Sequence, residues 1–488
     1  DLLGFLLKLD PDQEKLVKWA INGPTMVKGG AGTGKSTIAL YRIKALMNEA
    51  KNGKTPKVLF TTYTRALMAA NRQLLEKLLT PEQLAGVRIA TVDQIAHEIV
   101  AKNRTLGEAE SKKKMKNIWR RVRDEFVPTG DGGFDTRARK AALDSIPEDY
   151  LRDEIEWIIE GRGLKSLEEY LKAPRPGRGQ MFGQKLRTAV WEFSRALQEE
   201  VKKCGIERFS LLRAEAFELV ERGIWQERYD HVLVDEAQDL PPVGLALLAE
   251  LAGNEKGLFF TADAKQSLYS RNYSWASAHP RLQFTGRTAL LKTNYRSTRE
   301  IDRAAFALLK PGENEQLEKS TSPHEGPLPV LLDGFAFEDQ GHWIARFVRQ
   351  MSQALHLPLN SSAILVRSEG QGKALAEELA KENLAAHFYE GRELDLKAAT
   401  IKIITIHSAK GLEFPVVVVA GPPEGTYPAS ENYSDQELYQ EHLRQEARLL
   451  YVGVTRAMRG VMVIRPDGCS NEILQNLSED YWHVEKAQ

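Results

Sequence analysis

Apolar runs of strand length alternate with amphipathic stretches along much of the chain. Near the N-terminus, residues 25–27, 58–63 and 87–91 are short apolar runs, and residues 36–49 and 65–79 carry apolar positions at helical spacing. Further strand candidates follow at residues 231–234, 362–366, 401–406 and 415–420. Strands that alternate with helices are typical of parallel sheets covered by helices, so the pattern predicts an α/β protein.

Residues 107–225 interrupt this alternation. They are highly charged, follow a helical period and contain few β-branched runs. The pattern predicts a helical subdomain inserted into the first α/β unit. Two Pro- and Gly-containing stretches elsewhere, residues 310–329 and 421–437, are expected to form exposed connections.

Composition narrows the class of protein. The 67 basic and 67 acidic residues cancel, so any nucleic-acid surface must be local. The two cysteines, Cys204 and Cys469, lack the spacing of a zinc site or a disulfide framework. No apolar run reaches membrane-spanning length, so we expect a cytoplasmic protein without membrane contact. Because the chain starts at Asp1 rather than Met, a further N-terminal domain or a protein partner is left open.

The residues from Gly29 to Ser36 fit the phosphate-binding loop, in which two glycines enclose four residues and a Lys-Ser pair follows. The loop stands between a predicted strand and a predicted helix, where backbone N–H groups and the helix dipole attract anions. We expect Lys35 to reach the β- and γ-phosphates of ATP and Ser36 to hold Mg²⁺. The residues predicted to bind the nucleotide here are Gly29, Gly30, Ala31, Gly32, Thr33, Gly34, Lys35, Ser36 and Thr37.

Two acidic residues, Asp235 and Glu236, follow the apolar run 231–234. Open α/β sheets bind ligands at strand ends, so we expect Asp235 to hold Mg²⁺ and Glu236 to orient or deprotonate the attacking water. An acidic pair after a strand also occurs simply at a helix N-terminus, where it complements the helix dipole. The phosphate loop favours the catalytic interpretation.

Together with the phosphate loop, residues 235–239 (Asp-Glu-Ala-Gln-Asp) resemble superfamily 1 helicases of the UvrD/Rep/PcrA type. Further motifs of that family follow in its order along most of the chain. They are the Q motif at 9–13, motif Ia at 61–65, a strand-binding motif at 90–93, motif III at 263–269, motif IV at 293–298, motif V at 405–414 and motif VI at 451–457. The resemblance implies an α/β fold with two RecA-like P-loop domains that bind ATP between them.

The resemblance also implies roles for individual residues. Arg296 and Arg456 would be arginine fingers that stabilise negative charge on the transferred phosphoryl group, and Gln266 would sense the γ-phosphate.

At the nucleoside, the implied residues are Gln13 at the adenine edge, Tyr295 stacked on adenine and Glu413 at the ribose. Members of the family usually carry an arginine on adenine directly after the phosphate-loop Lys-Thr. Here Thr37 stands at that position, so base selectivity is expected to be weaker or to use Arg42.

Single-stranded DNA, alone or at a junction with duplex, is the implied partner. Such contacts need aromatic platforms and polar groups that follow the backbone. The stacking candidates are Tyr63, Tyr269, Tyr273 and Trp275, and the candidates for phosphate or sugar contacts are Thr62, Thr91 and His407. Each aromatic residue could equally belong to the core. Motif III of the family continues with Trp-Arg-Gly, and residues 271–275 differ from it, so the stacking arrangement is open.

Basic runs at residues 112–116 and 120–123, and the loop 175–178, are candidates for tracking a phosphate backbone. A basic run is also typical of a solvated helix face, and the sequence leaves both interpretations open.

The spacing of the motifs predicts a compact variant of the family. About 110 residues separate Arg296 from His407, an interval in which the family inserts a large subdomain called 2B. One α/β core fills most of that space, so we expect 2B to be absent or vestigial. The predicted domains are residues 1–106 with 226–290 for domain 1A, 107–225 for an insertion like subdomain 1B, 291–475 for domain 2A and 476–488 for a C-terminal tail.

The motifs together predict an ATP-dependent translocase or helicase that moves along single-stranded DNA in the 3′ to 5′ direction that the family implies. One alternative is a HelD-like ATPase that remodels RNA polymerase or another protein–nucleic acid complex, which the phosphate loop with residues 39–42 also resembles. Another is an ATP-gated nucleic-acid-binding module of a larger repair or defence machine.

Overall fold

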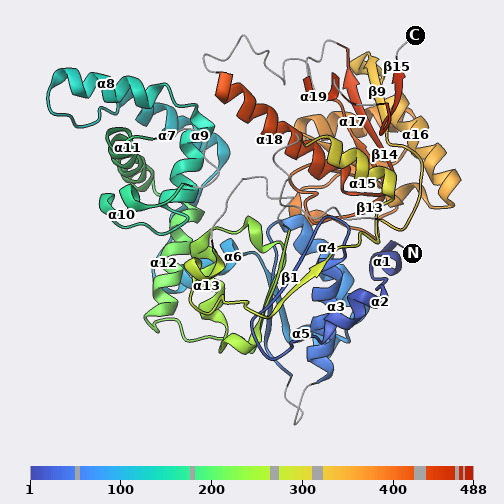
Figure 1. The fold of residues 1–488 in the computed structure, drawn as a ribbon, viewed down its shortest axis with the longest axis horizontal. Coiled ribbons are helices and arrows are strands. Elements are labelled where there is room, and N and C mark those ends of the chain that lie inside the picture. The colour runs from blue at the N-terminus through green and yellow to red at the C-terminus, as the bar shows by residue number, and fades with distance from the viewer. Residues whose placement is uncertain are drawn as a thin grey trace.

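The chain has two lobes and a helical insertion (Figure 1). The computed structural model describes residues 2–49, 55–175, 182–263, 274–309, 322–422, 436–467, 472–475, 477 and 479–486. The first lobe, at the bottom of Figure 1, is built on a sheet whose strands lie between Thr25 and Leu291, and the second lobe, at the upper right, on a sheet between Val330 and Lys486. The helical insertion lies at the upper left, so the prediction of an α/β fold with two sheets and an insertion is confirmed.

The first sheet contains, within the described residues, six parallel strands in the order β3-β2-β6-β7-β1-β8. Its strands are β1 (Thr25–Gly29), β2 (Val58–Thr61), β3 (Val87–Ala90), β6 (His231–Val234), β7 (Leu258–Ala262) and β8 (Thr288–Leu291). Its helices are α1 (Leu2–Leu6), α2 (Pro11–Val17), α3 (Lys35–Asn48), α4 (Arg65–Leu78), α5 (Pro81–Ala85), α6 (Val92–Asn103), α12 (Phe209–Glu221), α13 (Pro242–Leu251) and α14 (Trp275–Ala278). Because β7 lies between β1 and β6, the ends of these three strands meet at one edge.

Local sequence fixes where these helices begin. The Thr64 hydroxyl accepts a hydrogen bond from the N–H of Leu67 and starts α4. At the start of α6, Thr91 and Gln94 bond each other's backbone N–H groups in a capping box. The threonines that follow β2 and β3 are therefore held in place at the sheet edge.

The second sheet contains, among the described residues, seven parallel strands in the order β11-β12-β10-β13-β14-β9-β15. Its strands are β9 (Val330–Phe335), β10 (Ser362–Val366), β11 (Ala386–Phe388), β12 (Ile401–Thr405), β13 (Phe414–Val419), β14 (Ala457–Pro466) and β15 (His483–Lys486). Its helices are α15 (Arg299–Ala307), α16 (Gln340–Leu355), α17 (Glu369–Lys381), α18 (Gln436–Val454) and α19 (Glu472–Gln475), with a short turn of helix, η6 (Gly391–Glu393). Every residue of β13 is buried, as expected for a central parallel strand.

The end of the chain corrects one predicted boundary. Residues 476–488 were expected to be a tail, but β15 pairs in parallel with β9, and Trp482 beside it is 1% exposed. This pairing joins residues distant in sequence, which a periodicity argument does not see.

The helical insertion has a core of its own. Its elements are β4 (Glu108–Ala109), α7 (Lys112–Glu125), α8 (Gly133–Asp144), α9 (Glu148–Asp153), the π-helical turn η1 (Glu154–Ile159), α10 (Leu167–Lys172), α11 (Gln184–Lys203) and β5 (Ile206–Glu207). Trp119, Tyr170 and Phe193 are among the large side chains in this core. The predicted limit at residue 225 is too late, because α12 packs its apolar face on α6 and α13 of the first lobe.

The described residues between α15 and β12 build β9, α16, β10, α17 and β11, and they show no separate subdomain. One hydrophobic cluster runs through both lobes, from Leu67 and Leu74 on α4 to Leu396 and Leu412 of the second lobe. The lobes therefore share a packed contact. In the described parts of the chain, no helix combines the length and apolar character needed to cross a membrane.

Candidate nucleotide site between the lobes

The phosphate loop joins the end of β1 to the start of α3. Gly32 and Gly34 have φ values of 68° and 81°, a backbone conformation that favours glycine. A Cβ on Gly34 would lie 2.3 Å from Nε2 of Gln13, and one on Gly32 would lie 2.2 Å from Oδ1 of Asn294. Both the backbone conformation and the close neighbours therefore require glycine at these positions.

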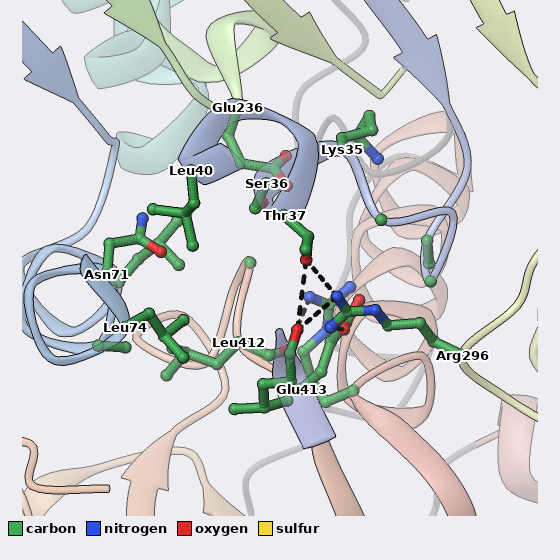
Figure 2. Close-up of a pocket in the computed structure, with 18 of the residues that line it drawn as sticks. Lys35, Ser36, Thr37, Leu40, Asn71, Leu74, Glu236, Arg296, Leu412 and Glu413 are labelled. Carbon is green, nitrogen blue, oxygen red and sulfur yellow. Dashed lines mark hydrogen bonds and ion pairs between the residues drawn. The ribbon is translucent and has the colours of Figure 1, made fainter. Parts of the chain in front are cut away.

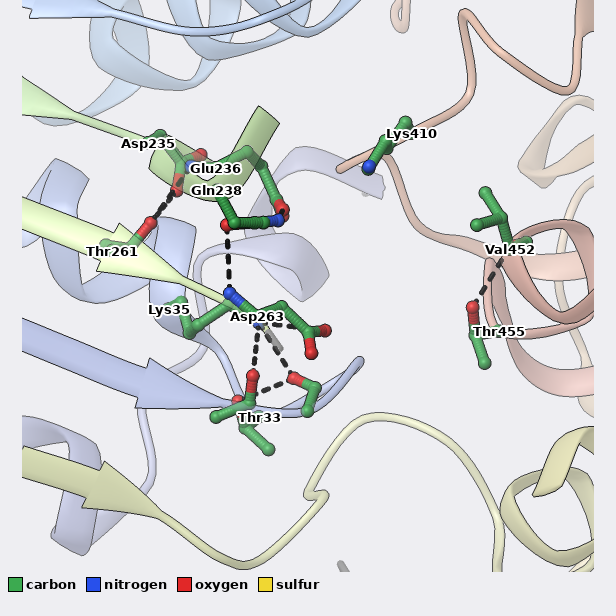
Figure 3. A network of polar contacts seen from close by, with 12 residues as sticks. Thr33, Lys35, Asp235, Glu236, Gln238, Thr261, Asp263, Lys410, Val452 and Thr455 are labelled. Carbon is green, nitrogen blue, oxygen red and sulfur yellow. Dashed lines mark hydrogen bonds and ion pairs between the residues drawn. The ribbon is translucent and has the colours of Figure 1, made fainter. Parts of the chain in front are cut away.

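Lys35 is buried at the first position of α3. Its Nζ donates hydrogen bonds to the carbonyls of Gly29 (3.0 Å) and Gly30 (2.8 Å) and lies 3.5 Å from the Asp263 carboxylate (Figure 3). The ammonium group is thus folded back onto the loop that would surround a phosphate. A phosphate that enters the loop would compete with the carbonyls of Gly29 and Gly30 for the hydrogen bonds of the Lys35 ammonium group.

Asp235 directly follows β6 deep in the first lobe. Its Oδ1 accepts a hydrogen bond from the Thr261 hydroxyl (2.5 Å), whereas its buried Oδ2 has no hydrogen-bond partner among the described residues. Burial and the neighbouring Glu236 carboxylate raise the pKa of Asp235, and the hydrogen bond from Thr261 and the nearby Ser36 hydroxyl oppose that rise. A buried carboxylate oxygen without a partner, next to a serine hydroxyl, has the chemistry of a Mg²⁺ site.

Glu236 has a φ of 54°, an uncommon conformation for a residue other than glycine, and it is buried. Burial would raise the pKa of Glu236, but the cations of Lys35 and Lys410 outweigh it and hold the pKa below its usual value. The Gln238 amide donates a hydrogen bond to Oε2 of Glu236 (2.5 Å) and accepts one from the backbone N–H of Asp263 (2.9 Å) (Figure 3). Glu236 is therefore kept ionised and oriented, and the sequence analysis gave Gln238 no such role.

The two predicted arginine fingers line the same cavity as the phosphate loop. Lys35 and Glu236 of the first lobe, and Arg296 and Arg456 from the other wall, all border it (Figure 2). Arg296 forms an ion pair with Glu413 (2.5 Å) and donates to the Leu6 carbonyl (2.7 Å) and the Thr37 hydroxyl.

Arg456 is held more firmly, because its guanidinium donates to the carbonyls of Val452 and Leu412 (3.0 Å each) and to the Thr455 hydroxyl (3.1 Å). It is 3% exposed. The guanidinium is thus fixed by its own lobe before any ligand arrives.

A buried ion pair, which the sequence analysis did not anticipate, crosses between the lobes. Nζ of Lys410 lies 2.6 Å from Oδ1 of Asp239, and both residues are almost fully buried. Asp239 is the last residue of the Asp-Glu-Ala-Gln-Asp run, and Lys410 belongs to the segment between β12 and β13. The acidic strand end of the first lobe is thereby tied directly to the second lobe.

Comparison with known proteins fits this geometry. The family model described as the UvrD/REP helicase N-terminal domain matches residues 9–284, more than half of the chain. The UvrD-like helicase C-terminal domain matches residues 289–394 and 388–465. The chain belongs to the UvrD/REP helicase family. The family expected from the motifs is confirmed.

Three UvrD-like relatives show how far the likeness extends. A probable DNA helicase of Mycoplasma pneumoniae is 24% identical over 471 residues, which is 93% of this chain and 82% of the relative. The DNA helicase PcrA of Leuconostoc citreum is 24% identical over 78% of this chain and 51% of its own length, and DNA helicase II of Escherichia coli is 25% identical over 80% and 52%. The chain thus spans about half the length of the last two relatives.

The residues that the UvrD-like motifs predict for the nucleoside lie near the phosphate loop. Nε2 of Gln13 donates to the Thr33 carbonyl (3.0 Å), and its Oε1 accepts from the Asp10 N–H (3.0 Å). The Tyr295 hydroxyl donates to the Asp12 carboxylate (3.0 Å). The structure therefore brings the Q motif beside motif IV.

Arg42 does not take the place of the missing adenine arginine. Its guanidinium is buried, lies 4.5 Å over the Phe259 ring and donates to the carbonyls of Val17, Trp19 and Ala20. Arg42 therefore holds the chain between α2 and β1, which corrects the alternative in which it reads the base. Its partners are backbone groups in another segment, so no sequence pattern indicates this role.

The predicted DNA contacts differ in their surroundings. Tyr63 is 37% exposed and His407 is exposed, whereas Thr62 and Thr91 are buried at the ends of β2 and β3. Trp275 packs its ring edge-on against Phe260 and Phe284, so its packing favours a role in the core. The predicted positions Gln266, Tyr269 and Tyr273 lie outside the described residues.

The basic runs are partly engaged within the insertion. Arg121 pairs with Glu200 (2.5 Å), and Arg123 donates to the carbonyls of Asp144 and Ile146. Arg175, whose side chain is 10% exposed, pairs with buried Glu154 (2.6 Å), so its guanidinium is engaged within the insertion and the candidate role in tracking DNA is disfavoured at this position. Lys113, Lys116 and Arg120 are exposed on α7 and recur at helical spacing on one face. Lys114 and Arg121 are exposed as well, but they pair with Glu108 and Glu200.

Proposed function

We propose that this protein is an ATP-dependent motor that moves along single-stranded DNA in the 3′ to 5′ direction. The observation that carries the proposal is the shared cavity, in which a phosphate loop and a carboxylate of the first lobe face two arginines on the opposite wall. A site divided in this way is assembled only when the lobes are held together. ATP hydrolysis is thereby linked to the distance between the lobes.

The carboxylates have separate tasks in this proposal. Asp235 and Ser36 would hold Mg²⁺, which when bound neutralises negative charge on the phosphate oxygens. Glu236, kept ionised by Lys35 and Lys410, accepts a proton from the attacking water or orients it. The Gln238 amide fixes the carboxylate from one side, so that the other oxygen faces the cavity.

The cations stabilise the transition state from both walls. Lys35 would exchange its bonds to the loop carbonyls for phosphate oxygens, and Arg296 would exchange its bond to Thr37. Arg456 keeps its backbone partners and contributes fixed positive charge. Because charge on the phosphoryl oxygens grows during transfer, these groups bind the transition state more strongly than the ground state.

Several surface features support single-stranded DNA as the track. Tyr63 offers an exposed ring two residues after the end of β2, and exposed His407 lies two residues after the end of β12 in the other lobe. Lys113, Lys116 and Arg120 on α7 form a basic stripe on the insertion that suits a phosphate backbone. The relatives that match this chain are named DNA helicases, which favours DNA over other polymers.

The test is the rate of ATP hydrolysis with and without single-stranded DNA, followed by strand displacement on duplexes with a 3′ or a 5′ tail. We expect strong stimulation by the single strand and displacement only with the 3′ tail. Stimulation without displacement would indicate a translocase. No stimulation, with RNA polymerase retained on the protein, would overturn the proposal in favour of a HelD-like remodelling ATPase.

A further inference from the structure

The rear of the cavity, away from the arginines, is closed by a contact between α4 of the first lobe and the second-lobe segment 391–397. Asn71 and Leu74 of α4 lie at this end of the cavity, on the side away from Arg296 (Figure 2). Leu67 of α4 and Leu396 of the second lobe also line the cavity. We call this contact the rear joint.

Gln73 makes the polar part of the rear joint. Its Nε2 donates a hydrogen bond to the carbonyl of Leu394 (2.8 Å), and its Oε1 accepts one from the N–H of Leu396 (2.9 Å). One amide therefore bonds two backbone groups of the other lobe in a fixed register. A shift of the segment by one residue would lose both bonds, because alternate backbone groups point in opposite directions.

Two stretches of second-lobe backbone, at Gly391 and Gly411, pass close to α4 on the same lobe contact as the Gln73 amide. Gly391, at a φ of 40°, would place a Cβ 3.2 Å from Cβ of Arg65, and Gly411, at a φ of 79°, would place one 2.5 Å from Cδ2 of Leu67. Leu394 and Leu396 are 2% and 3% exposed and belong to the same hydrophobic cluster as the leucines of α4, so this part of segment 391–397 is packed against α4. The outer ion pair of Lys397 with Glu76 (3.4 Å) is exposed and contributes little.

The end of the cavity that holds Lys35 and Arg296, here called the front, differs from the rear joint in the contacts that a bound nucleotide would replace. At the front, Lys35 and Arg296 donate to groups that phosphate oxygens would replace. At the rear, separation would leave the backbone groups of Leu394 and Leu396 without partners and expose buried leucines. The buried Lys410–Asp239 ion pair also crosses between the lobes and would be costly to separate. The least costly motion therefore keeps the rear joint and this ion pair, and it changes the contacts of Lys35 and Arg296 at the front.

We infer that Gln73 is a positioning residue, which holds the rear joint as the pivot about which the second lobe turns to bring its arginines to the phosphate loop. This inference rests on the proposed motor function for its effect on turnover. Its structural part, a joint that stays closed with or without nucleotide, can be measured independently.

The first experiment is hydrogen exchange of the intact protein with and without a non-hydrolysable ATP analogue. We expect the Leu396 amide to be protected equally in both states, while segments around Arg296 and residues 29–36 change. In Gln73→Met, which keeps the length of the side chain and removes its polar atoms, exchange at Leu396 should rise in both states. A change of protection at Leu396 caused by the nucleotide in the unmodified protein would overturn the pivot.

The second experiment measures kcat and KM for ATP in Gln73→Met and Gln73→Glu, with Arg72→Ala at the neighbouring exposed position as the matched control. We expect kcat to fall about tenfold in both Gln73 variants, the effect of losing an interlobe hydrogen bond in the assembled site, and KM to change less than about twofold. A fall no larger than in Arg72→Ala would overturn the positioning role. If single-stranded DNA fails to stimulate the unmodified enzyme, the motor function is wrong, and the exchange measurement still decides the joint.

Discussion

Both lobes contain a parallel sheet, but the functional side chains that line the shared cavity lie at the carboxyl ends of strands in the first lobe and at the amino ends of strands in the second. In the first lobe, the functional side chains follow the ends of strands: the phosphate loop follows β1, and Asp235 and Glu236 follow β6. In the second lobe they precede strands, because Glu413 stands directly before β13 and Arg456 directly before β14. The carboxyl edge of one sheet therefore faces the amino edge of the other across the cavity.

This difference shows why one fold supplies two sets of chemistry. The carboxyl edge offers a strand-to-helix turn, where N–H groups converge on an anion. The amino edge offers turns that enter strands, and here one such turn brings Arg456 to the cavity, whereas Arg296 lies between β8 and α15. The fold alone is thus a weak guide to function, and the edge that meets the partner lobe decides it.

The largest loss of ATP turnover is expected when catalytic side chains of the first lobe are substituted. We expect Glu236→Gln and Lys35→Ala each to lower ATP turnover by about a thousandfold or more, because the carboxylate and the phosphate cation act directly in the transition state. The melting temperature should change little in Glu236→Gln, since the amide keeps the shape of the side chain. Steady-state hydrolysis and thermal melts check this, and unchanged hydrolysis in both variants would show that the site is misassigned.

Removing an arginine from the opposite wall separates catalysis from folding. Arg296→Ala should lower kcat by about a hundredfold to a thousandfold, in the lower part of the range for arginine fingers or below it. It should cost less stability than Arg456→Ala, because the side chains of Arg296 and its partner Glu413 are 11% and 16% exposed and their charges stay within reach of water. Arg456→Ala should lower kcat and also the free energy of unfolding, because three internal hydrogen bonds are lost. Kinetics and urea unfolding of the two variants test the contrast, and equal stability losses would contradict it.

The buried ion pair between Lys410 and Asp239, which joins the two lobes, can be removed by substitution. Lys410→Met removes the ammonium group that forms a buried ion pair with Asp239 and should lower the free energy of unfolding by about 3–5 kcal/mol. The double variant with Asp239→Asn should recover part of that loss, since no buried charge remains. Denaturant unfolding of Lys410→Met, Asp239→Asn and the double variant gives a double-mutant cycle. If the losses of the two single variants add up to that of the double variant, the two side chains do not interact.

The smallest expected effect concerns Tyr63 and Trp275, the aromatic candidates for DNA stacking that lie among the described residues. Tyr63→Ala should weaken binding of single-stranded DNA by about 1–3 kcal/mol and leave stability nearly unchanged, because the ring is partly exposed. Trp275→Ala should lower stability instead, because its ring packs on Phe260 and Phe284. Fluorescence anisotropy with a labelled oligonucleotide, together with thermal melts, would expose a reversed pattern.

The sequence predicted the site best where a motif is continuous. The phosphate loop, the acidic strand end and the arginines were all found as local runs, and the strands at 58–61, 231–234 and 414–419 followed from their apolar patterns. Contacts between distant segments were missed, among them β15 on β9, Arg42 on residues 17–20 and Gln73 on Leu394. Such partners are backbone groups, which carry no residue-specific signal.

By itself, the sequence predicted several side chains that line the cavity between the lobes. Lys35 and Glu236 followed from glycine spacing, charge and strand periodicity, which are local properties of the chain, and Arg296 and Arg456 followed from the resemblance to the helicase family. Only the tertiary structure decided that the amino edge of the second sheet faces the carboxyl edge of the first, and that Lys410 meets Asp239 there. Buried charges and backbone groups gain their partners from packing, so the pairing depends on how the two lobes dock.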